Sequence, residues 1–178
     1  MHKVPLCLAL SMLALPAVAE ERMQIAIPGP FELAFEQTTG TGGIREWIFP
    51  DETLENWTRM ITYQRFANLP DVELLPFMNL MTGRLGEICP GASGQIASMG
   101  EQNGYEVSVF FTECPDSPAA PGNPEITLYK LMRGMDALHI LQFAWRYKPH
   151  RDEVQVAIQW STPQMLCDPQ KPDSPCQD

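Results

Sequence analysis

The stretch from residue 125 to residue 147 restricts the possible folds more than any other part of the chain. It consists of two apolar runs separated by a short break with Gly134 and Asp136, residue types that favour turns. Successive side chains of a strand point to opposite faces, and both faces of both runs carry apolar side chains. The pattern predicts a hairpin of two central strands covered on both sides. It identifies no activity.

A second hairpin is predicted around residues 103–104, because Asn-Gly between two strand-like runs is a strong signal for a two-residue turn. Such a turn pairs Gln102 with Tyr105, and counting outward places Ser93 opposite Cys114. The strand that begins at Tyr105 carries mainly polar side chains on one face. We therefore expect it to bury a single side and to lie near the edge of the sheet.

Two helices are predicted from apolar residues at helical spacing. The first begins near Leu74 or Leu75, with Pro76 in its first turn, and is ended by Cys89-Pro90-Gly91. The second follows the loop 148–152, with Asp152 at its N-terminal cap. Its inner stripe consists of Val154, Ala157, Ile158 and Ser161.

The segment before the first helix is predicted to form short strands and one helical turn. The strands span residues 23–27, 31–37, 44–49 and 57–65, and the helical turn spans residues 51–56. Together the elements predict an α+β fold. Its antiparallel sheet is built from hairpins, with one long helix and a C-terminal helix packed against it.

Residues 1–19 have the features of a secretory signal peptide: a basic start, an apolar run, and Ala17-Val18-Ala19 before the expected cleavage site. The apolar run is too short to span a membrane, and no later stretch reaches roughly 18 uninterrupted apolar residues. We therefore expect a periplasmic or secreted protein. Residues 20–166 are predicted to form one α+β domain, and residues 167–178 a proline-rich tail.

Four cysteines follow the predicted signal peptide, at positions 89, 114, 167 and 176. An even number in an oxidising compartment favours two disulfides, and four cysteines allow three connectivities. The predicted hairpin brings Cys89 close to Cys114, so we expect these two to be joined. Cys167 then pairs with Cys176, and this disulfide constrains the tail.

The formal net charge of −10 limits the classes of partner. Removal of the signal peptide takes away Lys3 and no acidic residue, which makes the chain still more negative. An acidic protein repels phosphate backbones and anionic membrane surfaces, so we expect neither nucleic acid nor lipid headgroups as partners. A basic partner, or none, remains open.

The order of the predicted elements is similar to that of the PsbP-like fold, which includes the bacterial envelope protein DcrB. Residues 55–62 and 144–146 also resemble segments of small uncharacterised secreted proteins of Gram-negative bacteria. These proteins share no catalytic residues that could be carried over. The resemblance implies a binding or assembly role.

The sequence offers little for histidine or metal chemistry. His139 lies within an apolar strand row, which is typical of a core or edge histidine, and His150 lies in a turn that leads into a helix. Met132, Met135 and His139 could bind cuprous ion, although methionines next to a turn usually fill gaps in the core. We therefore expect no catalytic residues, no metal and no cofactor.

Two functions from different classes remain. The favoured one is a non-catalytic protein that binds an envelope protein or a small ligand, with Arg146, Trp145 and Tyr147 as candidate binding residues. Arg146 could instead pair with an acidic neighbour. The alternative is a small periplasmic hydrolase that uses a carboxylate pair. A pocket with paired acidic residues would favour the hydrolase, and a flat aromatic patch would favour the binding protein.

Overall fold

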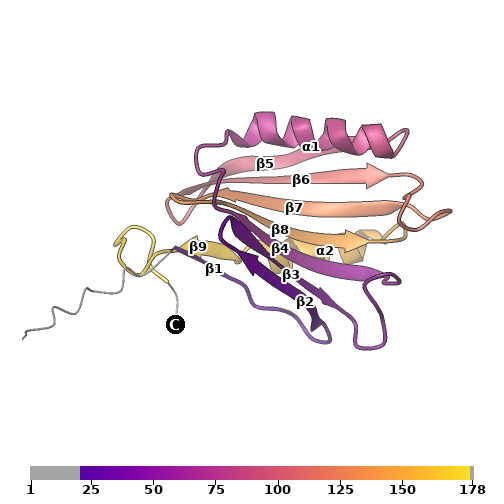
Figure 1. The fold of residues 1–178 in the computed structure, drawn as a ribbon, viewed down its shortest axis with the longest axis horizontal. Coiled ribbons are helices and arrows are strands. Elements are labelled where there is room, and N and C mark those ends of the chain that lie inside the picture. The colour runs from indigo at the N-terminus through magenta and orange to yellow at the C-terminus, as the bar shows by residue number, and fades with distance from the viewer. Residues whose placement is uncertain (1–20, 177–178) are drawn as a thin grey trace, which may run out of the picture.

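The computed structural model describes residues 21–176, and the predicted signal peptide lies outside these residues. The main sheet has seven antiparallel strands in the order β2-β3-β4-β8-β7-β6-β5 (Figure 1). Their bounds, in sheet order, are β2 (Glu32–Thr39), β3 (Gly42–Ile48), β4 (Arg59–Phe66), β8 (Leu138–Trp145), β7 (Glu125–Arg133), β6 (Tyr105–Cys114) and β5 (Ser93–Gln102). The structure confirms the predicted α+β class.

Three further pieces complete the fold. Helix α1 (Leu74–Ile88) runs along the β5–β6 end of the sheet, and helix α2 (Arg151–Ser161) lies behind the sheet in Figure 1. A separate two-stranded sheet pairs β1 (Arg22–Gln24) with β9 (Met165–Cys167), so the two ends of the described chain lie side by side. Among residues 21–176, no helix is long and apolar enough to cross a membrane.

The hairpin of β7 and β8 lies in the middle of the sheet, as the alternation of apolar residues predicts. Strand β8 pairs with β4 on one side and with β7 on the other. Leu138 and Ile140 contribute to the core under α1, whereas Leu141, Phe143 and Trp145 contribute to the core under α2. Every β8 side chain except that of Gln142 is buried. Burial on two faces therefore fixes this hairpin at the centre.

The prediction that β6 buries only one side is wrong. Ser108, Phe110 and Thr112 lie on its more polar face and are all buried, because α1 covers that face. The Ser108 hydroxyl contacts the sulfur of Met78 in α1 at 3.0 Å. The predicted position near the edge is confirmed, since only β5 lies outside β6.

The register of the β5–β6 hairpin agrees with the prediction at its turn and differs at its open end. Gln102 pairs with Tyr105, but a bulge between Ile96 and Ser98 places Ser93 opposite Glu113. A bulge inserts one extra residue into a strand, which shifts every later pair. Both predicted disulfides, Cys89–Cys114 and Cys167–Cys176, are nevertheless present.

Local details at three other places differ from the predictions. Residues 51–56 form turns instead of a helical turn, and the strand that follows begins at Arg59. The N-cap of α2 is His150 and not Asp152, because the Glu153 carboxylate accepts the His150 backbone N–H at 2.8 Å. In the predicted inner stripe of α2, Ala157 and Ser161 are buried, whereas Ile158 is 39% exposed.

Candidate functional site

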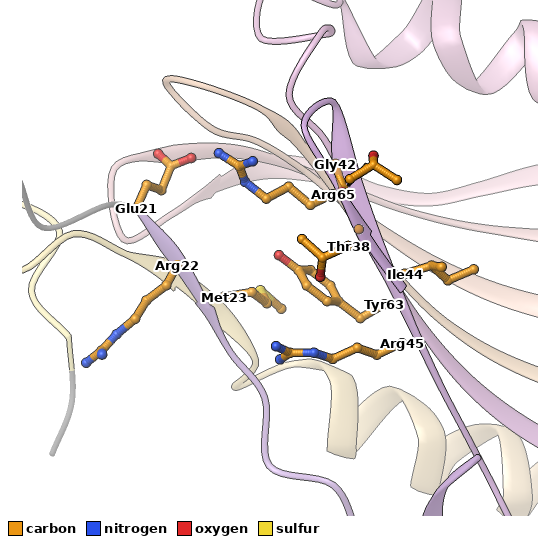
Figure 2. Close-up of a pocket in the computed structure, with 11 residues that line it drawn as sticks. Glu21, Arg22, Met23, Thr38, Gly42, Ile44, Arg45, Tyr63 and Arg65 are labelled. Carbon is orange, nitrogen blue, oxygen red and sulfur yellow. Dashed lines mark hydrogen bonds between the residues drawn. The ribbon is translucent and has the colours of Figure 1, made fainter. Parts of the chain in front are cut away.

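A pocket of about 410 Å³ lies between β1 and the β2–β4 part of the sheet, on the face that carries α2 (Figure 2). Tyr63 and Arg65 are two positions apart on β4, so both side chains point into the pocket, and Arg45 of β3 lies opposite Tyr63. Figure 2 shows the three side chains extending toward β1, with the Tyr63 ring between the two arginines. Thr38 and Thr39 of β2, Arg22 of β1 and the Glu21 carboxylate are the other polar residues of the lining, and the Arg22 side chain points away from the sheet in Figure 2.

The wall of this pocket depends on a glycine at the start of β3. Gly42 has a φ of +153°, and a Cβ atom there would lie 1.9 Å from the backbone oxygen of Arg65. Only glycine allows β3 and β4 to approach so closely at this point. The approach places the β2–β3 turn beside Arg65 and closes one end of the pocket.

Beside the pocket, three side chains from distant parts of the chain, those of Glu21, His139 and Tyr63, form a buried chain of hydrogen bonds, the buried relay. Glu21 Oε1 lies 3.2 Å from His139 Nε2, and the Tyr63 hydroxyl lies 2.8 Å from His139 Nδ1. The His139 side chain is fully buried and that of Glu21 is 4% exposed. An ionised carboxylate accepts only, so Nε2 carries the proton and Nδ1 accepts the hydrogen bond from Tyr63.

The turn between β7 and β8 holds Glu21 in this position. The backbone N–H of Met135 donates to Glu21 Oε2 at 2.9 Å. A Cβ atom on Gly134 would lie 1.9 Å from Glu21 Oε1, so the glycine leaves room for the carboxylate. On the same turn, Asp136 Oδ2 accepts a hydrogen bond from Arg65 at 2.6 Å. The N-terminal residue of the described chain is thereby attached to the central hairpin.

The carboxyl groups at this position have opposite pKa shifts. Burial alone would raise the pKa of Glu21, but hydrogen bonds from His139 and Met135 outweigh it and lower the pKa. Burial raises the pKa of Asp136 against the attraction of Arg65, and the charge of Glu21 adds to the increase. Burial likewise raises the pKa of Tyr63, which keeps the phenol protonated. Glu21 is therefore the more readily ionised of the two acids.

A second buried polar centre lies on the same face, at Lys130 of β7. Its ammonium group lies within hydrogen-bonding distance of four oxygens, which its three N–H groups share: the backbone oxygens of Ser161, Thr162 and Gln164 at 2.6 to 2.9 Å, and Gln102 Oε1 at 2.6 Å. These oxygens lie at and just beyond the C-terminal end of α2, where a cation is favoured. Burial lowers the pKa of Lys130 to about 8. This arrangement anchors α2 to the sheet.

Of the three residues proposed from the sequence as a binding site, Trp145 and Tyr147 pack in the same core cluster and Arg146 lies apart from them. Trp145 is completely buried in the core. Arg146 stacks on the Trp57 ring at 3.9 Å and lies 3.6 Å from Glu125, so it has the acidic neighbour that the sequence analysis considered. Tyr147 packs against the core on the α2 face instead, which separates it from Arg146. Arg146 lines a different pocket, of about 290 Å³.

Sequence reasoning singled out one member of the buried relay, His139, and interpreted it as a core histidine. The structure places it in the core, as that interpretation requires, and adds Glu21, Tyr63, Arg65 and Asp136 around it. Of the other possible grouping, Met132 is buried and pairs with His139 across β7 and β8, whereas Met135 is 70% exposed. The only signal in the sequence was a histidine within an apolar row.

Comparison with known proteins gives only a distant structural similarity. No protein-family model and no curated protein matches the sequence. Among solved structures, the chain is similar to LpqN, which is involved in cell envelope biogenesis of Mycobacterium tuberculosis, with a TM-score of 0.41 and 11% identity. The alignment covers 85% of this chain and 86% of that chain. No family match supports the PsbP-like or DcrB resemblance, and the similarity to LpqN is too distant to assign a function.

Proposed function

We propose that this protein is a non-catalytic, extracytoplasmic binding protein that takes a small anion in the pocket beneath β1. The observation that carries the proposal is the placement of two guanidinium groups, of Arg45 and Arg65, on either side of the Tyr63 hydroxyl (Figure 2). Guanidinium groups bind carboxylate and phosphate with paired hydrogen bonds. The two disulfides support a location in an oxidising compartment.

Arg45 is paired with Glu36, but this ion pair is weak enough for a ligand to compete for the arginine. Arg45 Nε lies 2.6 Å from Glu36 Oε1, with side-chain exposures of 52% and 43%. Exposed pairs of this kind contribute only about 0 to 1 kcal/mol, so a bound anion can replace Glu36 at low cost. Arg65 is less exposed, at 23%, and Asp136 holds it in place. The pocket thus combines Arg65, whose guanidinium group Asp136 holds in place, with Arg45, whose guanidinium group can exchange Glu36 for a ligand.

The test is calorimetric titration of the disulfide-bonded protein, in metal-free buffer at low salt, with citrate, succinate and inorganic phosphate. We expect at least one of these anions to bind, and Arg45→Gln and Arg65→Gln each to weaken binding by about tenfold, the loss of one charged hydrogen bond. Arg133→Gln is the matched control, because Arg133 also forms a partly exposed strand pair, with Glu106 at 2.7 Å, on the opposite face.

Two results would contradict the proposal: binding of none of the three anions, or an equal loss of affinity in the Arg133→Gln control. Added salt provides a further check. Anion affinity at an open pocket must fall as ionic strength rises, because salt screens the charges of the two arginines.

The hydrolase alternative has a candidate carboxylate pair in Glu21 and Asp136, which lie beside the same pocket. The burial of Glu21 and its bonds to His139 and Met135 favour the binding protein, since a hydrolytic carboxylate must reach substrate or water. Hydrolysis of nitrophenyl esters or glycosides that is lost in Asp136→Asn, but retained in Asp51→Asn, would reverse this preference.

A further inference from the structure

The cluster behind the pocket has the donor set of a metal site. Glu21, Asp136 and His139 each offer one ligand atom, and these atoms all lie within 4.8 Å of one another. One imidazole nitrogen with two carboxylate oxygens is a ligand combination that suits zinc and related divalent ions. We propose that these three residues bind a divalent transition-metal ion, with Zn²⁺ as the best match. This proposal does not depend on anion binding in the pocket.

Each of the three ligands is oriented by a second hydrogen bond, which is usual in metal sites. The Tyr63 hydroxyl lies at His139 Nδ1, the Met135 N–H donates to Glu21 Oε2, and Arg65 donates to Asp136 Oδ2. If a metal takes Nε2, the imidazole proton moves to Nδ1 and is donated to the Tyr63 oxygen, and the Tyr63 O–H turns toward the pocket that Tyr63 lines. The imidazole remains neutral, so the relay accommodates the change without a buried charge on histidine.

Asp136 can bind a metal through one carboxylate oxygen while its other oxygen stays paired with Arg65. Its Oδ2 atom pairs with Arg65, whereas its Oδ1 atom is buried and has no hydrogen-bond partner. A buried carboxylate oxygen without a partner is costly, and a cation removes that cost. The two carboxylates also repel each other, and a divalent ion between them would neutralise both.

Two further buried hydroxyls lie next to the cluster, that of Tyr105 beside Glu21 and that of Ser174 beside Tyr105. Tyr105 is 3% exposed and Ser174 is fully buried, and although these groups interact, neither hydroxyl makes a hydrogen bond of good geometry. The Tyr105 phenol faces Glu21, whose charge helps to raise the Tyr105 pKa to about 12 after the larger effect of burial. Buried polar atoms are satisfied in most proteins, so unsatisfied ones next to a His-carboxylate cluster point to a bound group. Water held by the metal would supply the missing partners.

The site needs only a small adjustment to bind zinc. Ligand atoms around one zinc ion lie roughly 3 to 3.5 Å apart, because each bond to the metal is about 2.0 to 2.2 Å long. The present limit of 4.8 Å therefore calls for a movement of about 1 Å. Asp136 can supply this movement, since it lies in the β7–β8 turn and its side chain is 43% exposed.

The test uses the disulfide-bonded protein without a polyhistidine tag, stripped of metal and titrated calorimetrically with Zn²⁺ in the absence of anionic probes. We expect about one equivalent to bind, and Asp136→Asn to weaken binding by at least about tenfold. Asp51→Asn is the control, because Asp51 is an exposed carboxylate in a turn and does not belong to the proposed ligand cluster. Asp136 is partly exposed, so its variant is expected to fold.

A second measurement identifies the histidine. After residue 20 the chain has two histidines, His139 and His150, which gives a simple imidazole nitrogen spectrum. Zinc is expected to shift Nε2 of His139 and to leave His150 unchanged. The proposal is overturned if zinc shifts only His150, if binding is far below one equivalent, or if Asp136→Asn and Asp51→Asn bind zinc equally. Loss of anion binding in the pocket would not affect this result.

Discussion

The Lys130 centre and the Glu21–His139 centre are both buried on the α2 face of the sheet, but they balance their charge in different ways. Lys130 is surrounded by neutral oxygens, three of which belong to backbone at the end of α2. Glu21 is surrounded by polar side chains: those of His139, Asp136 and Tyr63 and, through Asp136, that of Arg65. Both centres lie beside a pocket, but the first is held mainly by fixed backbone and the second by side chains.

This contrast separates a structural site from a candidate functional one. Every hydrogen-bonding position of the Lys130 ammonium is used within the fold, so nothing remains for a ligand. The other centre has unsatisfied oxygens on Asp136, Tyr105 and Ser174. Perturbed and incompletely satisfied groups beside a cavity are typical of functional sites, although a strongly perturbed pKa alone is not. Lys130 illustrates the exception.

The largest expected effect is that of Lys130→Ala. The change takes the charged donor from three backbone oxygens at the end of α2, of which those of Ser161 and Thr162 keep a neutral donor, and also opens a cavity. We therefore expect a loss of about 3 to 5 kcal/mol in the free energy of unfolding. Urea denaturation measures it. Zinc and anion affinity should be unchanged in the folded fraction, and a loss of either would remove the distinction between the two centres.

The pH dependence of stability tests the same lysine by a reversible change. Burial lowers the pKa of Lys130 from 10.5 to about 8, so between these values the unfolded chain binds more protons than the folded one. Stability therefore rises with pH through this window, by up to about 3 kcal/mol. The rise is measured as the difference in stability between the wild type and Lys130→Met. The tyrosines contribute equally to the pH dependence of both proteins, so their contribution cancels in this difference. Parallel stability curves for the two proteins would show that the lysine keeps its ordinary pKa.

Gly134→Ala tests the Glu21–His139 centre, because Gly134 lies against the Glu21 carboxylate. The added Cβ would displace Glu21 Oε1 and leave the buried Nε2–H of His139 without an acceptor, which should cost about 2 kcal/mol in the free energy of unfolding. Gly100→Ala is the matched control, since nothing lies within 4 Å of a Cβ at that strand position. If both variants lose the same stability, the contact of Glu21 with His139 contributes nothing.

Arg65→Gln should have the smallest effect on stability. The Arg65–Asp136 pair is partly exposed, so its loss should lower the free energy of unfolding by only about 1 kcal/mol. Anion affinity should nevertheless fall by about tenfold, because the cation is lost from the pocket. A large fall in stability with unchanged anion affinity would class this centre with Lys130 as purely structural.

Much of the fold could be predicted because its signals are local. The Asn-Gly turn, the helical spacing from Leu74 and the double-sided alternation of residues 125–147 all give the observed elements. Some errors occur where a distant element intervenes, and others where a local irregularity departs from the regular pattern. The polar face of β6 is buried because α1 lies on it, and the β5 bulge shifts a register that turn geometry alone would have set differently.

The sequence by itself determined the α+β class, the central hairpin and both disulfide partners, because periodicity and turn chemistry act between neighbouring residues. The candidate site was decided only by the tertiary structure. Glu21 and His139 are 118 residues apart, and Tyr63 and His139 are 76 apart. A lone histidine in an apolar row has no local pattern that indicates its partners. They become visible only when the pairing of β4 with β8, and the path of β1 beside the sheet, bring the three side chains together.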